Sequence, residues 1–211
     1  MSEFKPFPKI PRLNRDMVVT EKIDGTNAAI HIVHYTNMNR ITDNETGEWT
    51  LFDDDAEKAI IAGEYVLFAQ SRKRFITTEY DNYEFAQWVE DNATGLVDTL
   101  GEGVHFGEWW GRGIQRGYGT KHRYFSLFNV AKWEDADLSA VPGLLTVPVL
   151  CRGLFDTNAV NFQIQRLDLL GSFAAPGFDR PEGVIVYHEA ANSMFKVMCE
   201  NDNLPKGLTS E

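Results

Sequence analysis

A lysine two residues before an Asp-Gly pair is the first feature of this chain that could do covalent chemistry. The stretch "EKIDGTN" covers residues 21–27 and follows the apolar run "MVV", so Lys22 stands where a predicted strand runs into a turn. Residues two apart on a strand share a face, so Lys22 and Asp24 could point into one cleft while Gly25 lets the chain turn close to a ligand. The pattern K-x-D-G alone arises by chance in roughly a few per cent of chains of this length, so its meaning depends on the rest of the sequence.

Other residues of the kinds that bind nucleotides and metals occur inside predicted strands or at their ends. They are Arg72 in "QSR", Glu108 in "FGEWWG", Phe125 and Phe128 in "YFSLFNV", Glu182 in "PEGVIV" and Lys196 in "MFKV". Each also has a structural explanation: an edge carboxylate can form a salt bridge, a lysine can face solvent on an edge strand, and a phenylalanine is ordinarily part of the core. Only their combination points to a site.

The elements that must position these residues are mostly strands. Period-two alternation with β-branched and aromatic residues predicts strands over residues 27–35, 64–71, 104–110, 123–130, 146–152, 183–188 and 193–199. Helices are predicted over residues 83–92 and 158–170, with a short turn around residues 95–100; Asp156 or Thr157 is placed to cap the last helix. Because short turns join most strands, we predict an α+β fold of largely antiparallel sheets flanked by helices.

Length and composition bound the class of protein. With 211 residues, 43% hydrophobic and 12% aromatic, the chain should form a folded globular protein, and we predict one domain over residues 1–211 with a C-terminal tail at residues 201–211. It has neither the roughly 18 consecutive apolar residues of a membrane span nor the apolar block of a secretory signal, so we expect a cytoplasmic protein with no membrane partner. Cys151 and Cys199 form no zinc-binding pattern and are predicted to be reduced thiols.

Charge is unevenly distributed along the chain. The net charge of −11 argues against a protein that coats nucleic acid through bulk electrostatics, but it leaves room for a local basic cleft. Acidic residues gather in residues 43–59, which we interpret as a solvated loop and the start of a helix. Basic residues gather in residues 71–75 and 111–125, and an anionic partner would bind at these two stretches.

Taken in order, the motifs resemble those of the covalent nucleotidyltransferases, the superfamily of ATP-dependent polynucleotide ligases and messenger-RNA capping enzymes. The likeness is greatest to the bacteriophage-type ATP-dependent RNA ligases that seal nicks. It runs from "EKIDGTN" (first motif) through "SR", "FGEWWG" (third), "YFSLFNV" (its companion) and "EGVIV" (fourth) to "FKV" (fifth), and so spans residues 21–197. The resemblance implies the fold of a ligase adenylation domain, which is ATP-grasp-like, here without an OB-fold.

The resemblance also implies a reaction in three steps, with Lys22 as the nucleophile toward the α-phosphate of ATP. The AMP then passes to a 5′-phosphate end, and a 3′-hydroxyl displaces it to close the strand. A lysine phosphoramidate is reactive enough to hand the nucleotide on. However, an unperturbed lysine has a pKa of about 10.4 and is charged at neutral pH, so burial and nearby cations are needed to favour its reactive form.

A second lysine and a metal fit that need. By resemblance Lys196 contacts the α-phosphate, and Mg²⁺ supplies further positive charge there. Mg²⁺ is held by hard oxygen ligands, keeps several waters and takes only one or two carboxylates. We expect Glu182 to be its first ligand and Asp24 the second choice.

Residues that bind the nucleoside follow from the same resemblance. Phe128 is the preferred stacking surface for adenine and Phe125 the second choice, because alternation places the two on opposite faces. The further expected contacts with nucleotide or substrate are Glu108 and Arg72 to ribose hydroxyls or phosphate-bearing ends, Asn27 to the nucleotide or the strand being joined, and the backbone of Glu21 to the adenine amino group.

Two departures from the family pattern leave alternatives open. Relatives read lysine, any residue, lysine in the fifth motif, whereas Met198 stands at the second position here; the missing contact would be worth about 1.5 to 3 kcal/mol. Only residues 198–211 follow that motif, where relatives carry an OB-fold or a helical domain, so a protein partner could supply grip on the substrate. The sequence therefore predicts an RNA ligase acting on RNA rather than DNA. The alternatives are a module that charges Lys22 but seals no strand, and a minimal DNA ligase.

Overall fold

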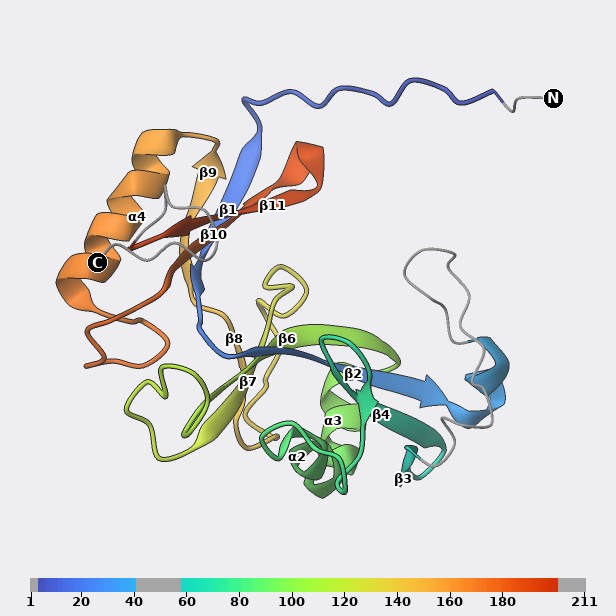
Figure 1. The fold of residues 1–211 in the computed structure, drawn as a ribbon. Helices are drawn as coiled ribbons and strands as arrows, with labels where there is room; N and C mark the ends of the chain where they lie inside the picture. Colours follow the sequence, from blue (N-terminus) through green and yellow to red (C-terminus); the bar gives the residue numbers. More distant parts are fainter. Residues whose placement is uncertain (1–3, 41–57, 201–211) are drawn as a thin grey trace. The chain divides into compact units, whose positions relative to one another are not determined.

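The computed structural model describes residues 4–40 and 58–200, and its chain divides into two compact units. Unit 1 is formed by residues up to 23 together with those from 148 onward, and unit 2 by residues 24–147. The chain therefore passes between units twice, directly after Ile23 and directly after Val147. Both units combine a sheet with helices (Figure 1), which confirms the α+β prediction. The predicted tail at residues 201–211 and most of the acidic stretch lie outside the described residues.

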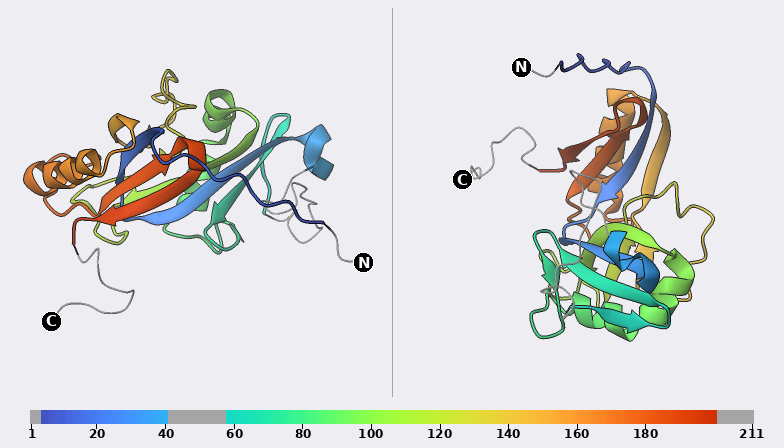
Figure 2. Two further views of the ribbon diagram at one scale, coloured as in Figure 1. Left: turned by 90° about the horizontal axis from the view of Figure 1, so that it is seen from above. Right: turned by 90° about the vertical axis from the view of Figure 1, so that its right-hand side faces the viewer.

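Unit 1 is built on a four-stranded antiparallel sheet in the order β11-β10-β1-β9. The strands are β1 (Asp16–Lys22), β9 (Val149–Leu154), β10 (Gly183–His188) and β11 (Ser193–Met198), with a short 3-10 helix, η2 (Glu189–Ala191), before the last. Helix α4 (Thr157–Leu170) runs alongside these strands (Figures 1 and 2). Its N-cap is Asp156, whose side chain accepts a hydrogen bond from the Asn158 amide at 2.8 Å, so the first of the two predicted caps is confirmed.

Side chains alternate along these strands, so the sheet of unit 1 has one apolar face that packs against α4 and a second face that does not. Met17 and Val19 of β1 pack with Val184 and Val186 of β10 against α4, and the buried helix residues in this cluster are Val160 and Leu167. Because side chains alternate across a strand, Thr20 and Lys22 of β1 lie on the opposite face. The functional end of the first motif therefore lies on the face of the sheet away from α4.

Unit 2 is built on a larger sheet in the order β3-β4-β2-β6-β7-β8, with β5 paired to β4. Its strands are β2 (Thr26–His34), β3 (Ile60–Ala62), β4 (Tyr65–Ser71), β5 (Phe75–Ile76), β6 (Gly103–Gly111), β7 (Arg123–Leu127) and β8 (Leu144–Thr146). The helices are η1 (Tyr35–Arg40), α2 (Phe85–Asp91) and α3 (Ala93–Leu100). Among the described strands β7 and β8 alone pair in parallel, so the antiparallel prediction is confirmed.

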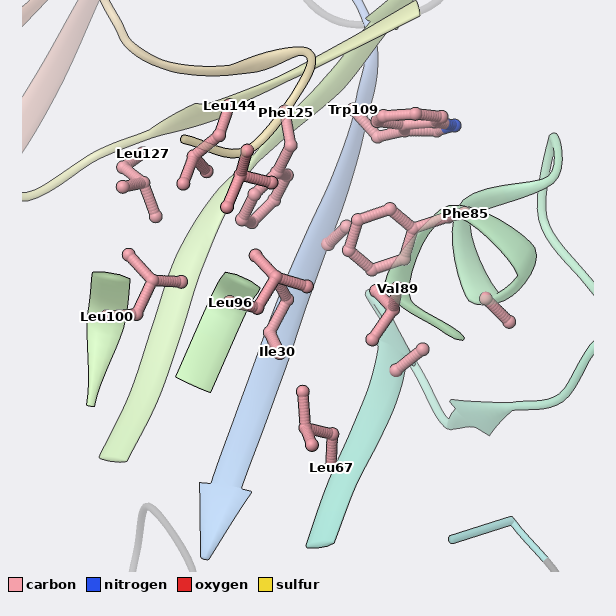
Figure 3. Packing of buried hydrophobic residues seen from close by; sticks show 14 of the residues in the cluster. Ile30, Leu67, Phe85, Val89, Leu96, Leu100, Trp109, Phe125, Leu127 and Leu144 are labelled. Atoms are coloured by element: carbon pink, nitrogen blue, oxygen red, sulfur yellow. The ribbon is translucent and has the colours of Figure 1, made fainter. Parts of the chain in front are cut away.

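The core of unit 2 lies between its sheet and helices α2 and α3. Figure 3 shows Ile30 of β2 and Leu67 of β4 beneath Phe85, Val89 and Leu96 of the helices. Trp109, Phe125 and Leu127 extend this cluster along β6 and β7. The helix-facing side of the sheet is therefore apolar, and the polar residues of the motifs must lie on its other side.

Three predicted elements differ from the structure for identifiable reasons. The strand predicted over residues 146–152 is two strands, β8 and β9, because Val147 and Pro148 connect the two units and proline cannot donate a hydrogen bond to a sheet. The helix predicted from residue 83 begins at Phe85, since Tyr83 and Glu84 have positive φ angles. The short turn around residues 95–100 is the end of a helix, α3.

Within the described part of the chain, no helix is long and apolar enough to cross a membrane. Among the described residues, Cys151 and Cys199 are half-buried and form no disulfide.

Candidate active site

Lys22 is the last residue of β1 and forms an ion pair within unit 1. Its neighbour across the sheet is Gly183, the first residue of β10, and Glu182 directly precedes that strand. The Lys22 Nζ donates to Glu182 Oε2 at 2.5 Å, and the two side chains are 23% and 13% exposed. The lysine of the first motif and the carboxylate of the fourth motif, 160 residues apart in sequence, are thus brought into direct contact.

Gly183 makes this close arrangement of strands sterically feasible. Its φ is +153°, and a Cβ atom at this position would lie 2.2 Å from the Val197 carbonyl oxygen and 2.8 Å from the Met198 Cα. Any side chain would therefore push β11 away from β10. Glycine at this position keeps the fifth motif packed beside the fourth.

Lys196 lies on β11, on the same face of the sheet as Lys22. Its partner in register is Ile185 of β10, which in turn pairs with Thr20 of β1, and Thr20 shares a face with Lys22. The Lys196 side chain is exposed. Met198 pairs with Gly183 in the same row as Lys22, so the position where a second lysine was expected lies directly across Gly183 from Lys22.

The side chain of Glu21 has a role that the sequence did not predict. It is 1% exposed and accepts hydrogen bonds from the Ser172 hydroxyl at 2.6 Å and from the amides of Phe173 and Ala174 at 2.8 and 2.9 Å. Burial raises the pKa of the Glu21 carboxyl, and these three hydrogen bonds oppose that shift. The side chain thus ties the loop after α4 to the strand that ends at Lys22. The Glu21 amide donates to the Pro148 carbonyl at 2.9 Å.

Asp24 lies in unit 2, beyond the end of β1, so the argument that it shares a strand face with Lys22 was wrong. Its Oδ2 accepts a hydrogen bond from Arg116 Nε at 3.0 Å, in an ion pair whose side chains are 28% and 29% exposed. Its amide donates to the Tyr118 hydroxyl at 2.7 Å. The loop between β6 and β7 therefore holds the turn that follows the lysine.

Gly25 passes so close to β6 that no side chain would fit. A Cβ there would lie 2.4 Å from the Trp109 carbonyl oxygen and 2.8 Å from the Trp110 Cβ. Its amide donates to Glu108 Oε1 at 3.2 Å. The structure therefore requires a glycine at this position for the close approach to β6, and the predicted approach of Gly25 to a nucleotide stays a prediction.

Asn27 and Glu108 are directly paired in register between β2 and β6, and Ser126 of β7 continues the row. By alternation this row lies on the face of the sheet away from α2 and α3, since Ala28, Trp109 and Phe125 belong to the helix-side core. Asn27 and Glu108 are both half-buried. Two of the predicted contact residues are therefore brought together on one partly accessible face.

The two candidate stacking residues differ in accessibility. Phe125 is fully buried and packs in the helix-side core, with ring centroids 5.1 Å from Phe85 and 5.9 Å from Trp88. Phe128 follows β7, is half-buried, and its amide donates to the Phe106 carbonyl at 3.0 Å. A ligand could reach the Phe128 side chain, whereas it could not reach Phe125 without opening the core.

Arg72 lies in the turn between β4 and β5 and is exposed. The turn is closed by the Ser71 amide and hydroxyl, which both donate to the Arg74 carbonyl, at 2.9 and 3.0 Å. In register, β4 ends with Ser71 opposite Ala28 of β2, so Arg72 follows at the end of β2 that carries Asn27.

Carboxylates suited to a divalent cation occur in the described residues, although no group of three or more His, Cys, Asp or Glu side chains that could hold a metal is found among them. Mg²⁺ does not need such a group, because it commonly takes one or two carboxylates and completes its shell with waters and substrate phosphates. Glu182 presents a carboxylate beside the Lys22 amine, so its oxygen chemistry fits the cation. The Asp24 carboxylate is engaged with Arg116.

Three further contacts around the predicted residues were not anticipated: those made by Arg116, Tyr118 and Ser172. Each joins a residue of the first motif to a segment more than 90 residues later. Arg116 lies in the basic stretch that was predicted to bind an anionic partner. Nothing in the sequence indicated that it would pair with Asp24 instead. The other two residues are neither charged nor part of a recognisable motif.

Comparisons with known proteins agree with this architecture. The chain matches the family model described as RNA ligase over residues 15–198. A search of curated proteins finds no match. Among solved structures, the chain is similar to an arginine-to-alanine variant of the Naegleria gruberi RNA ligase with ATP and Mn, at 14% identity and a TM-score of 0.52, covering 89% of this chain and 51% of that one.

Two further structures of the Naegleria gruberi RNA ligase give similar values. An aspartate-to-alanine variant without ligand matches at 15% identity and a TM-score of 0.51, and a glutamate-to-alanine variant with AMP and Mn at 17% and 0.50; each alignment covers 88% of this chain and 50% of that one. This chain thus spans about half the length of these solved structures. At such identities the likeness shows a shared fold.

Proposed function

Because the chain belongs to the RNA ligase family, we propose that it is an ATP-dependent RNA ligase that joins a 5′-phosphate end to a 3′-hydroxyl end. The observation that carries this proposal is the ion pair of Lys22 with Glu182, in a sheet that also presents Lys196 on the same face. These are the residues that the first, fourth and fifth motifs supply. Two of the similar structures of the Naegleria gruberi RNA ligase are complexes, one with ATP and Mn and one with AMP and Mn, which supports ATP and a divalent metal here.

The proposed reaction balances in three steps. In the first, the neutral Lys22 amine attacks the α-phosphorus of ATP, so that an N–P bond forms and pyrophosphate leaves. In the second, a 5′-phosphate oxygen of RNA attacks the same phosphorus, so that the N–P bond breaks and AMP is joined to the RNA end. In the third, a 3′-hydroxyl attacks the 5′-phosphorus of that end, and AMP leaves.

Lys22 must give up its proton and its ion pair before it can attack. The contact with Glu182 is a resting arrangement that holds Nζ in place. A second cation disfavours the ammonium, and Lys196 is the residue proposed to bring positive charge to the α-phosphate. Mg²⁺ or Mn²⁺, when bound through Glu182, would neutralise phosphate charge. Asp24 remains the second choice as a ligand.

In this proposal the residues of unit 2 recognise the nucleotide and the RNA ends. Phe128 stacks on adenine, because it is accessible where Phe125 is not. Glu108 and Arg72 hold ribose hydroxyls or phosphate-bearing ends, and Asn27 contacts the nucleotide or the strand being joined. Gly25 keeps the backbone after Lys22 close to Glu108, and the Glu21 backbone in unit 1 is proposed to meet the adenine amino group.

A second candidate function is favoured by Met198. The residue that faces Lys22 across Gly183 is apolar, so one cation expected at the phosphate is absent from that position. A chain with this change could accept AMP on Lys22 and yet fail to seal strands unless a protein partner supplies further contacts. Adduct formation and sealing must therefore be measured separately.

The adduct is tested by incubating the purified protein with α-labelled ATP and a divalent metal. Wild type should retain the label through neutral or alkaline work-up and lose it in acid, as expected for an N–P bond. Lys22→Ala and Lys22→Arg should retain none, because neither side chain can act as the nucleophile. Equal labelling of wild type and Lys22→Ala would refute the proposal.

Sealing is tested with matched nicked substrates in RNA and DNA. The proposed function predicts that RNA ends are joined and that DNA ends are joined more slowly. An adduct without sealing of either strand would instead support the self-adenylylating module, and preferential sealing of DNA would indicate a DNA ligase.

A further inference from the structure

The loop between β6 and β7, residues 112–122, is a positively charged segment outside the proposed chemical site. Its sequence, "RGIQRGYGTKH", contains two arginines, one lysine and no acidic residue, within a chain of net charge −11. Arg116 is directed to Asp24. Arg112, Lys121 and His122 are exposed. The loop therefore concentrates positive charge on the surface of an acidic protein.

Two buried side chains anchor this loop to unit 2. Ile114 is fully buried in the helix-side core, and Tyr118 is 3% exposed with its ring 5.1 Å from that of Trp110. The Tyr118 hydroxyl also accepts the Asp24 amide. Because the middle of the loop is fixed at two points, its backbone holds the charged residues in defined positions.

Hydrogen bonds close the neck of the loop, where its charged residues lie. The Arg112 amide donates to the His122 carbonyl at 3.0 Å, and the Thr120 hydroxyl donates to the same carbonyl at 2.7 Å. Arg123 Nε donates to the Arg112 carbonyl at 3.0 Å, while its guanidinium pairs with Glu84. Arg112 and Lys121 are thus held on adjoining segments at the two ends of one closed loop.

The backbone of the loop adopts conformations that most residues avoid. Gln115 and Tyr118 have φ angles of 45° and 51°, in the left-handed region. Such conformations persist when the surrounding structure enforces them, and they concentrate at ligand clamps and active sites. These two residues therefore give the backbone of the loop a defined course.

We propose that the β6–β7 loop binds the phosphate backbone of the RNA substrate through Arg112 and Lys121. This rests on the proposed function, and it names the surface on which the RNA strand lies. Arg and Lys side chains neutralise phosphates in nucleic-acid complexes, and a fixed loop loses less entropy on binding than a mobile one. The contacts of the loop with Asp24 also link this surface to the turn that follows Lys22.

The proposal is tested by the affinity of the full chain for a fluorescent, 5′-phosphorylated RNA at several salt concentrations. Arg112→Ala/Lys121→Ala should raise the Kd about tenfold and flatten the dependence of log K on log salt by about 0.7 for each lost contact. The double variant should fold normally, because both side chains are exposed and alanine keeps the backbone bonds of the neck. A thermal melt checks this.

Two controls isolate the effect. Arg112→Lys/Lys121→Arg keeps the charge and should keep most of the affinity. Lys132→Ala removes an exposed lysine of the same unit beside Trp133, whose ring lies 5.5 Å from that of His105 near the other end of β6, and it should leave the RNA Kd unchanged.

Adduct formation from ATP alone shows whether the loop binds the phosphates of RNA or the triphosphate of ATP. The proposal predicts that Arg112→Ala/Lys121→Ala forms the AMP adduct at the wild-type rate while it binds RNA weakly. A slower adduct with unchanged RNA affinity would mean that the loop meets the triphosphate of ATP, and the proposal would be wrong. Unchanged Kd and salt dependence, or wild type that does not bind RNA, would also overturn it. RNA binding that depends on the loop in a protein that forms no adduct would uphold this inference while refuting the proposed ligase.

Discussion

In unit 1 the face of the sheet away from the helix carries two lysines, Lys22 and Lys196, whereas in unit 2 the corresponding face carries Asn27 and Glu108. Both sheets bury their other face, which carries a hydrophobic cluster, against helices. The same design therefore presents cations in one unit and hydrogen-bonding groups in the other. Under the proposed function, unit 1 would supply charge for chemistry at phosphorus and unit 2 would recognise the nucleoside and the RNA.

This division of roles leads to a general expectation for substitutions in the two units. Substitutions in unit 1 should mainly lower the rate constant of adduct formation, because they remove charge that acts in the transition state. Substitutions in unit 2 should mainly weaken nucleotide binding. Two of the three predictions that follow test this separation between rate and binding. The other concerns the pH dependence of stability, which depends on the ionisable groups that the two units bury.

The largest effect is expected for Lys196→Ala. It should lower the rate constant of adduct formation at saturating ATP about 10² to 10³-fold, the cost typical of removing a preorganised charge or donor in the transition state. The ATP concentration at half-saturation should change much less. Met194→Ala is the matched control, because this residue lies on the same face of β11 and is 70% exposed. Equal effects of both substitutions would show that the strand edge, rather than the lysine charge, matters.

The next effect is on stability and comes from His105 of unit 2. Its side chain is 3% exposed and hydrogen-bonded to the Gly101 carbonyl at 2.9 Å, and burial lowers its pKa from 6.5 to about 4. Between pH 6.5 and 4, His105 is therefore mostly protonated in the unfolded chain and mostly neutral in the folded chain. The free energy of unfolding should fall by about 2 kcal/mol from this residue between pH 7 and 5.

Denaturant titrations of wild type and His105→Gln at several pH values check this prediction. The difference in stability between the two should shrink as the pH falls, since the variant lacks the group. Unit 1 buries Glu21 instead, whose raised pKa gives the opposite sign: its contribution should fall as the pH rises above 4.5. A difference between wild type and His105→Gln that is independent of pH would show that His105 has the same pKa in the folded and unfolded states.

The smallest effect separates two phenylalanines of unit 2. Phe128→Leu should raise the Kd for ATP about threefold to tenfold, because an aromatic stacking surface is lost, with little change in stability. Phe125→Leu should instead lower the free energy of unfolding by about 1 to 2 kcal/mol and leave the Kd within about twofold of wild type. Isothermal titration with ATP and thermal melts measure the two. The reverse outcome would place adenine against the helix-side core.

Much of the fold followed from local pattern. Strong alternation predicted β2, β4, β6 and β10 to within a few residues, because each has one face in an apolar core. β3 and β5 were not predicted, since they have three and two residues and carry too little alternation to detect. The division into two units was not visible either, because it depends on the passage of the chain at Pro148 and not on any change in composition.

The site was predictable only where a motif names the residue. Lys22, Glu182 and Lys196 were selected from their motifs, and the structure brings the first two into contact. The contacts of Glu21 with Ser172 and of Asp24 with Arg116 join segments 151 and 92 residues apart. Such contacts depend on tertiary packing, so no spacing in the sequence could indicate them.

Lys22 is the residue proposed to accept AMP, and peptide mapping of the nucleotide adduct identifies the modified side chain. The protein is charged with ATP and a divalent metal, digested at neutral or alkaline pH, and analysed by mass spectrometry. We expect one modified peptide, the one that contains Lys22, with Lys196 unmodified. A nucleotide on Lys196 or on any other side chain, with Lys22 unmodified, would contradict it.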